Sequence, residues 1–255
     1  MKSTETKGPP TDSVADFFNM LSPRYREQYK SVRTGASFNF HRRLDLAYEL
    51  ASHSSGRLLD CGCGPGEITS ALLRSGRFTS ATVVDVSTQM LEAARALIPQ
   101  ENSQVPVEFV QSDILELSAD LVGTFDLIVC LGVLAHVGRI DELLDRLKTM
   151  LRPGGSILFQ VTRAEHVGVR IFNLLGGRIY ASRHGYRMSY YHSREIERAF
   201  ERADLRIIDR RRHSLYIPFA DKVWPRANYT IERSLREWSS RHGADTIYLL
   251  SQRQT

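Results

Sequence analysis

The segment from Arg57 to Thr69 decides the fold class of this chain, and it reads RLLDCGCGPGEIT. A short apolar run ends at Asp60, glycines follow at positions 62, 64 and 66, and a helical pattern begins at Glu67. Glycine is needed where the backbone turns sharply and where a ligand approaches too closely for a side chain. The segment therefore predicts a strand, a glycine-rich turn and a helix. The glycines could serve a ligand or only the turn itself.

The spacing of these glycines separates two classes of cofactor. A dinucleotide-binding turn has the pattern Gly-x-Gly-x-x-Gly, which would place its third glycine at position 67. This chain has Glu67 there. A carboxylate at a helix N-terminus disfavours a pyrophosphate group at the same place. It is compatible with a cofactor that has no phosphate and carries a positive centre, which is the chemical outline of S-adenosylmethionine.

Strand-like and helical patterns alternate outward from this segment. Short apolar runs bounded by Gly, Pro, Asp or Ser predict seven strands, at 57–61, 82–86, 107–111, 125–131, 156–161, 205–211 and 246–251. Helical spacing of apolar residues between them indicates βαβ units. We therefore predict an α/β fold, a Rossmann-like three-layer sandwich around a mostly parallel sheet.

Acidic residues follow the second and third predicted strands. Asp85 lies in the run VVDVS and Asp113 in the run QSDI. A carboxylate at the first position can accept hydrogen bonds from both ribose hydroxyls of a nucleoside. One at the second position can accept from an adenine amino group, with Ile114 against the ring. Each acid can instead cap a helix or turn, so both interpretations stand.

The fourth predicted strand, 125–131, is almost wholly apolar and should lie near the centre of the sheet. The chain continues from it as GVLAHV. Ligands in such sheets bind beyond the carboxyl ends of the strands. Leu131, Gly132 and His136 are therefore expected near the reacting centre.

Taken together, these motifs resemble the class I S-adenosylmethionine-dependent methyltransferases, and in particular the small-molecule branch with quinone-biosynthesis and natural-product enzymes. The matching runs are LLDCGCGPG, VVDVS, SDI, FDLIVCLGVLAHV and LRPGG, between Arg57 and Val161. The resemblance implies a seventh strand antiparallel to the others, the glycine turn beside the methionine tail, Asp85 on the ribose and Asp113 at the adenine. Many relatives have Glu-His where this chain has Ala135-His136, so a role tied to that glutamate is absent.

A set of residues at the carboxyl ends of the strands is expected to bind S-adenosylmethionine and its product S-adenosylhomocysteine. They are Asp60, Cys61, Gly62, Gly64, Pro65, Gly66, Asp85, Val86, Met90, Ser112, Asp113, Ile114, Leu131 and Gly132.

Two histidines are candidate catalytic bases. Methyl transfer from a sulfonium needs alignment of the reactants above all, and a hydroxyl acceptor also benefits from a base. His136 is the first candidate, with packing on the cofactor as the alternative. His192 is the second, with a surface position before a helix as the alternative. The eight histidines are scattered without ligand spacing, so no metal is expected.

Residues outside the motifs are expected to form the acceptor site. We predict one methyltransferase domain over 11–255 after a disordered lead-in at 1–10, with a helical lid at 11–53 and substrate-side insertions at 163–192 and 218–243. Candidate substrate residues are Tyr25, Tyr29 and Arg33, which share one helical face if a helix continues past Pro23, and Tyr190 and Tyr191. Plain packing faces are the alternative.

The net charge of +5 is unevenly distributed. Residues 163–255 hold 18 basic and 10 acidic side chains, whereas 1–162 hold 16 and 19. A basic second part can face an anionic substrate, a membrane surface or nucleic acid, or be a solvated surface. Arg210, Arg211 and Arg212 alternate faces of a predicted strand, and no RNA-binding module is present. We expect a small-molecule acceptor, hydrophobic or anionic, with peripheral membrane contact as an option and no nucleic-acid partner.

The three cysteines, Cys61, Cys63 and Cys130, are too few for a disulfide framework. They read as small core residues, and a reducing cytoplasm fits them. The leading hypothesis is methylation of a hydroxyl oxygen of a small or lipid-like molecule. The alternatives are N- or C-methylation, an RNA or protein acceptor, and a non-catalytic cofactor-binding protein. The oligomeric state and the pathway stay open.

Overall fold

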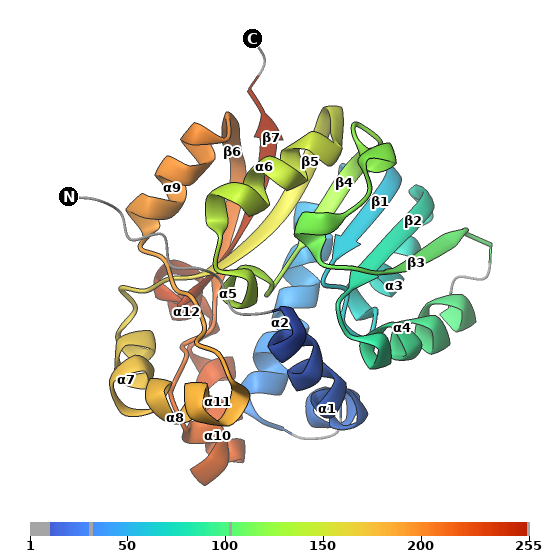
Figure 1. Cartoon of the computed structure of the whole chain (residues 1–255). Helices are drawn as coiled ribbons and strands as arrows, with labels where there is room; N and C mark the ends of the chain where they lie inside the picture. Colours follow the sequence, from blue (N-terminus) through green and yellow to red (C-terminus); the bar gives the residue numbers. More distant parts are fainter. Residues whose placement is uncertain (1–10, 31–32, 102–103, 254–255) are drawn as a thin grey trace.

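A computed structural model describes residues 11–30, 33–101 and 104–253, and the predicted lead-in at 1–10 lies outside them. The fold is a seven-stranded sheet with helices on both faces (Figure 1). The strand order is β3-β2-β1-β4-β5-β7-β6. The strands are β1 (Gly56–Cys61), β2 (Phe78–Asp85), β3 (Val107–Gln111), β4 (Phe125–Cys130), β5 (Leu151–Thr162), β6 (Leu205–His213) and β7 (Asp245–Gln252).

The directions of the strands confirm the predicted sheet. β1 pairs in parallel with β2 and β4, β2 with β3, and β4 with β5. β7 lies between β5 and β6 and is antiparallel to both. Because all strands except β7 run in the same direction, their carboxyl ends lie at one edge of the sheet, where ligands of such folds bind.

Each face of the sheet is covered by its own set of helices. Successive side chains of a strand point to opposite faces. Leu59 and Ile128 therefore belong to a core shared with α6 (Ile140–Met150) and α9 (Ser193–Arg202). Leu58 and Leu127 belong to a second core. Helices α2 (Gly35–Leu50), α3 (Glu67–Leu73) and α4 (Thr88–Glu101) contribute to that core.

Two helices precede β1, as predicted. α1 (Thr11–Lys30) continues through Pro23 and contacts α2, α4 and α8 (Gly177–His184). α2 begins after Thr34, whose side chain accepts a hydrogen bond from the Ser37 backbone N–H in a capping box. α1 therefore lies across the carboxyl edge of the sheet, beside a helix of the insertion after β5.

Both predicted insertions are helical. The first holds α7 (Val167–Leu175) and α8, and the second holds α10 (Ala220–Val223), α11 (Pro225–Ser234) and α12 (Arg236–His242). α7 contacts α8, α10 contacts α11, and all four helices lie on the same side of the sheet (Figure 1). The ring of Phe172 in the first insertion packs against that of Phe219 in the second, with 6.0 Å between the ring centroids. Asp221 accepts hydrogen bonds from the backbone N–H groups of Gly35 and Ala36 and so ties the second insertion to α2.

α9 begins directly after His192, which is its N-cap residue. The carboxylate of Glu195, at the third position of the helix, accepts a hydrogen bond from the His192 backbone N–H at 2.8 Å. This contact fixes the start of the helix, as in a capping box.

Candidate cofactor and acceptor site

A cavity of about 370 Å³ lies at the carboxyl edge of the sheet. Its floor comes from the turn after β1, the end of β2 and the segment after β4. Phe17, Phe18 and Tyr25 of α1 line it as well. The volume is in the usual range of small-molecule sites. The predicted helical lid therefore contributes one wall of this cavity.

The glycine turn combines two requirements. Gly62, Gly64 and Gly66 have φ values of 70°, 53° and 86°, a region that side chains disfavour. A Cβ atom on Gly62 would lie 2.4 Å from Cγ2 of Val133, so packing excludes a side chain there. A Cβ atom on Gly64 would meet nothing within 4 Å, and Gly64 lines the cavity. The open side of Gly64 leaves room for a ligand, as a cofactor site requires.

Asp85 ties the glycine turn to β2. One of its carboxylate oxygens accepts a hydrogen bond from the Gly64 N–H and the other from the Ser87 N–H, each at 2.9 Å. Burial raises the pKa of Asp85, and these hydrogen bonds oppose the increase. Ser87 itself caps α4, because its hydroxyl accepts from the Met90 N–H. Each carboxylate oxygen has a further lone pair, so Asp85 can still accept from a ribose hydroxyl.

The segment after β3 forms the opposite wall. Asp113 and Ile114 both line the cavity. One Asp113 oxygen accepts a hydrogen bond from the Leu115 N–H at 3.0 Å and caps a short 3₁₀ helix, Ile114–Glu116. Ile114 is buried and offers an apolar surface. The cap that the sequence left as an alternative is present, and it holds Asp113 at the edge of the cavity.

Ten of the fourteen expected cofactor residues line the cavity, namely Gly62, Gly64, Pro65, Asp85, Val86, Met90, Asp113, Ile114, Leu131 and Gly132. Asp60, Cys61, Gly66 and Ser112 do not. Asp60 is buried and its carboxylate accepts a hydrogen bond from the Thr69 hydroxyl at 2.6 Å. Burial raises the pKa of Asp60 to about 7. Its position indicates that it fixes α3 to β1.

Arg43 of α2 is a site residue that the sequence analysis missed. It lines the cavity, and its Nη1 atom lies 3.1 Å from the place that a Cβ atom on Gly132 would occupy. Its Nε atom is buried and has no hydrogen-bond partner among the described residues. Arg43 is half-buried, and a guanidinium with an unused buried donor fits a carboxylate ligand. No sequence motif distinguishes Arg43, because His41, Arg42 and Asp45 beside it are also polar or charged.

His136 lies in the short helix α5 (Leu134–Val137), directly after β4. It lines the cavity, and its Nδ1 atom is hydrogen-bonded to the Tyr186 hydroxyl at 2.8 Å. The hydroxyl of Tyr180, another lining residue, lies 3.3 Å from that of Tyr186. Burial lowers the pKa of His136 to about 4 and raises the pKa of Tyr186. The imidazole is therefore neutral near pH 7.

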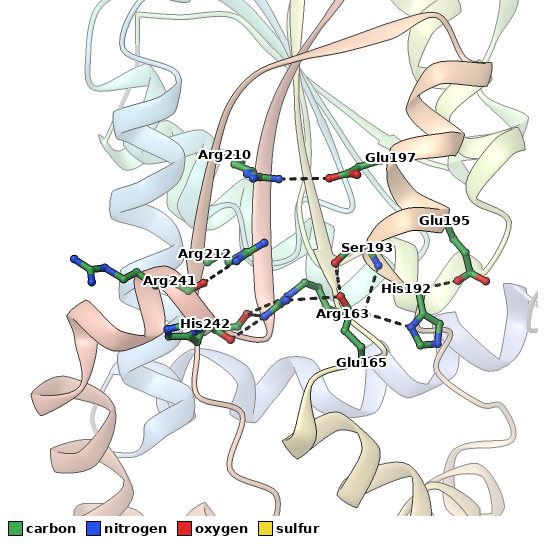
Figure 2. Close-up of polar contacts among 11 residues, drawn as sticks. Arg163, Glu165, His192, Ser193, Glu195, Glu197, Arg210, Arg212, Arg241 and His242 are labelled. Carbon is green, nitrogen blue, oxygen red and sulfur yellow. Dashed lines mark hydrogen bonds and ion pairs between the residues drawn. The ribbon is translucent and has the colours of Figure 1, made fainter.

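His192, the second candidate base, does not line the cavity. Figure 2 shows it in a separate polar cluster at the start of α9, where it faces Glu165 at 3.6 Å. Glu165 also accepts hydrogen bonds from the hydroxyl and the backbone N–H of Ser193 and pairs with Arg163. The side chain of His192 is 62% exposed. The surface position that the sequence left as an alternative is the one observed.

The candidate substrate residues are divided by the fold. Tyr25 lines the cavity, and the side chain of Tyr29 lies outside the described residues. α1 ends at Lys30 and Arg33 is exposed, so the predicted shared helical face does not include Arg33. Tyr190 and Tyr191 do not line the cavity. Their hydroxyl groups bond to the Tyr216 hydroxyl and the Gly138 carbonyl, respectively.

The comparison with known proteins identifies the family of this chain. Residues 32–210 match a family described as a methyltransferase domain. The chain belongs to this methyltransferase family. Ubiquinone biosynthesis O-methyltransferases are among its curated relatives. The protein from Azotobacter vinelandii is 33% identical over 103 residues, or 40% of this chain and 43% of the relative. The protein from Bordetella avium is 28% identical over 145 residues, or 56% and 58%. The matches thus span about half of these relatives.

Solved structures share the fold of this methyltransferase. The magnesium protoporphyrin IX methyltransferase of Synechocystis, solved with bound S-adenosylhomocysteine, has a TM-score of 0.67 at 15% identity, covering 95% of this chain and 99% of that one. The cyclase SpnF has a TM-score of 0.66 at 17% identity and covers both chains completely. The fold alone therefore does not decide which reaction takes place.

S-adenosylmethionine is the cofactor of this methyltransferase, and the cavity has a side chain that can bind each of its parts. Arg43 can pair with the methionine carboxylate, Asp85 can accept from the ribose, and Asp113 with Ile114 can face the adenine. Among the described residues, no group of three or more His, Cys, Asp and Glu side chains is placed to hold a metal ion. No helix in the described part is long and apolar enough to cross a membrane.

Proposed function

We propose that this methyltransferase transfers a methyl group to a hydroxyl oxygen of a small, lipid-like molecule. The observation that carries the proposal is the partly buried hydrogen bond between the Tyr186 hydroxyl and His136, which lines the cavity beside the aromatic side chains of Phe17, Phe18 and Tyr180. A neutral amine needs no base to accept a methyl group, whereas a hydroxyl benefits from one. The names of the curated relatives support the same type of acceptor.

The proposed role of His136 is to take the proton of the acceptor hydroxyl on Nε2. S-adenosylmethionine supplies an activated methyl group, which moves to the acceptor oxygen as the bond from carbon to sulfur breaks. Arg43 holds the methionine end of the cofactor, Asp85 its ribose and Asp113 its adenine end, so that only the acceptor has to be aligned. Phe17, Phe18 and Tyr180 give the acceptor an aromatic wall and keep water away.

Tyr186 is proposed as a positioning residue for this step. If Tyr186 accepts a hydrogen bond from Nδ1–H, then Nε2 carries the free lone pair that faces the acceptor. The Tyr186 hydroxyl can then donate to the Tyr180 hydroxyl, 3.3 Å away. As Nε2 takes a proton, the Nδ1 proton can pass to Tyr186, the Tyr186 proton to Tyr180 and the Tyr180 proton to water. The histidine then never has to keep a second proton that burial disfavours.

The proposed reaction sets the roles of the remaining parts. α1 acts as the lid, and the two insertions enclose the acceptor, within one domain over 11–255. The three cysteines are free and buried, which supports a cytoplasmic location. Methylation of nitrogen is the second candidate. The lowered pKa of His136 supports this alternative, because it makes His136 a weak base. A neutral amine can accept a methyl group without a base.

Calorimetric titration with S-adenosylhomocysteine, with NADH as the control ligand, tests the cofactor. Turnover is then measured on pairs of aromatic acceptors that differ only in a hydroxyl or an amino group. We expect micromolar binding of S-adenosylhomocysteine and no binding of NADH. The hydroxyl members of the pairs should be methylated, and His136→Ala should lower their turnover at least about 100-fold. Turnover of the amines alone, or His136→Ala with wild-type turnover of hydroxyls, would overturn the proposal.

A further inference from the structure

Large apolar side chains are exposed together on the two insertions. Leu174 and Leu175, at the end of α7, are 83% and 62% exposed, and Val223 and Trp224, at the end of α10, are 59% and 68% exposed. Contact between Phe172 and Phe219 brings the two insertions together. We call the outer side of α7, α8, α10 and α11 the insertion surface. Large apolar side chains with such high exposure, on two neighbouring insertions, are typical of an interaction site.

The same surface is cationic. Between 167 and 192 the chain has four arginines and no acidic residue, and all four are exposed. None of them forms an ion pair within the described part of the chain. Arginines elsewhere have acidic partners, as in the pairs Arg202–Asp141 and Arg152–Asp126. The positive charge of the first insertion is therefore not balanced locally.

The acidic residues of the second insertion do not balance it either. Asp221 accepts hydrogen bonds from the start of α2 and from Asn228. Glu232 is 1% exposed and accepts from the Leu215 N–H and from Asn39. Both carboxylates are thus engaged in hydrogen bonds within the protein. Glu237 is the exposed acidic residue between 218 and 243. Five basic residues lie in that range.

We propose that the insertion surface docks on a lipid bilayer with anionic headgroups. Aliphatic and aromatic side chains enter the boundary of the acyl chains while neighbouring arginines and lysine meet the phosphates, as in interfacial helices. A second copy of this chain is a poorer occupant, because a twofold contact would oppose like charges without acidic partners. The inference rests on the proposed lipid-like acceptor and explains how the enzyme would reach it.

The position of α8 links this surface to the site. Tyr180 of α8 lines the cavity, whereas Ile179 on the same helix is 55% exposed. α8 also contacts α1, which forms another wall of the cavity. α8 therefore lies between the insertion surface and the cavity, so docking would place the acceptor site beside the bilayer that holds a lipid-like acceptor.

Vesicle binding tests the proposal directly. The full chain is sedimented with vesicles of phosphatidylcholine alone or mixed with equal phosphatidylglycerol, at low and high salt. We expect binding to the anionic vesicles to be at least about tenfold stronger and to weaken with salt. Both tryptophans of the chain, Trp224 and Trp238, lie in the second insertion and are exposed. Trp224 belongs to the insertion surface and its emission should shift to shorter wavelength on binding, whereas Trp238 lies in α12, outside that surface.

Paired variants separate the two parts of the surface. Leu174→Glu with Trp224→Glu removes apolar contacts, and Arg178→Gln with Arg226→Gln removes two charges. Each pair should weaken binding to anionic vesicles about 30-fold. The matched controls are V122E and R206E. Both positions are exposed and precede β4 or begin β6, at the opposite edge of the sheet. These controls should bind vesicles like the wild type.

Turnover of a water-soluble hydroxyl acceptor is measured for the wild type and for every variant. This measurement distinguishes a failure of the docking inference from a failure of the proposed function. Surface variants that keep turnover but lose vesicle binding support docking, whereas absence of turnover in every variant counts against the proposed function alone. Absence of binding of the wild-type protein to anionic vesicles would overturn the inference. The same follows if the surface variants bind vesicles like the wild type, or if they disrupt only a dimer.

Discussion

The Nδ1 atom of His136 lies 2.8 Å from the hydroxyl of Tyr186, although 50 residues separate them in the chain. His136 follows the central strand β4, whereas Tyr186 lies between α8 and α9, in the insertion after β5. The contact shows that this insertion supplies a polar partner to a residue of the cavity wall, in addition to covering the carboxyl edge of the sheet. It supplies a buried hydroxyl that can fix the tautomer of the histidine.

Replacing Tyr186 by phenylalanine removes only this hydroxyl. We expect kcat for a hydroxyl acceptor to fall about 10- to 100-fold, because His136 loses the partner that orients it and accepts its proton. The Kd of S-adenosylhomocysteine should stay unchanged. The solvent isotope effect on kcat should increase, a readout that a merely structural role would not move. Tyr190→Phe is the matched control, since that hydroxyl pairs with Tyr216 outside the cavity. Equal kcat in both variants would contradict the role of Tyr186.

The pH dependence of turnover should reflect the lowered pKa of His136. A group that must be neutral loses activity below its pKa, and burial brings this pKa to about 4. We therefore expect kcat for a hydroxyl acceptor to be level between pH 6 and pH 8, with an acid limb near pH 4. Circular dichroism at each pH separates this limb from unfolding. An acid limb near the ordinary histidine pKa of about 6.5 would show that His136 is solvated during the reaction.

Asp85→Ala should weaken binding of S-adenosylhomocysteine at least tenfold. The change removes one or two charge-assisted hydrogen bonds to the ribose, each worth about 1.5–3 kcal/mol. The N–H groups of Gly64 and Ser87 also lose their acceptor, so the melting temperature should fall. Titration is therefore carried out well below the melting temperature of the variant. Affinity within threefold of the wild type would remove Asp85 from the ribose site.

Arg43→Gln tests the carboxylate partner that the structure adds. Loss of a charge-assisted hydrogen bond should raise the Kd of S-adenosylhomocysteine about 10- to 100-fold. Methylthioadenosine, which has no amino-acid tail, should bind the variant and the wild type equally. Arg42→Gln is the control, because Arg42 pairs with Glu49 and does not line the cavity. A loss of methylthioadenosine affinity would instead indicate that Arg43 only shapes the pocket.

Asp60→Asn should make the protein more stable at high pH. In the folded chain the pKa of Asp60 is raised from 3.8 to about 7 by burial. Its contribution to stability is present below pH 4 and is lost as the pH rises through 7, because the unfolded chain ionises more easily. The free energy of unfolding of the variant relative to the wild type should therefore rise from pH 4 to pH 8, by at most about 4 kcal/mol. Urea denaturation measures it, and a constant difference would mean that Asp60 stays ionised.

The sheet and most of the cofactor site followed from local sequence patterns. All seven strands lie within a few residues of their predicted ranges, except that β2, β5 and β6 are longer. The glycine turn and the acids after β2 and β3 were found because strands, turns and caps each constrain residue types at fixed short spacing. In a parallel sheet the carboxyl ends of such strands meet at one edge. Local spacing therefore also predicted which of these residues gather.

Tertiary structure alone decided the remaining parts of the candidate site. It brought Arg43 and Tyr180 to the cavity and Tyr186 to His136, and it placed His192 at the surface and Arg33 beyond the end of α1. The helices of the two insertions were not predicted either. Which side chains face a common cavity depends on the direction in which each insertion returns across the sheet. That direction is set by contacts between distant residues, such as Phe172 with Phe219 and Asp221 with the start of α2, and no local pattern encodes them.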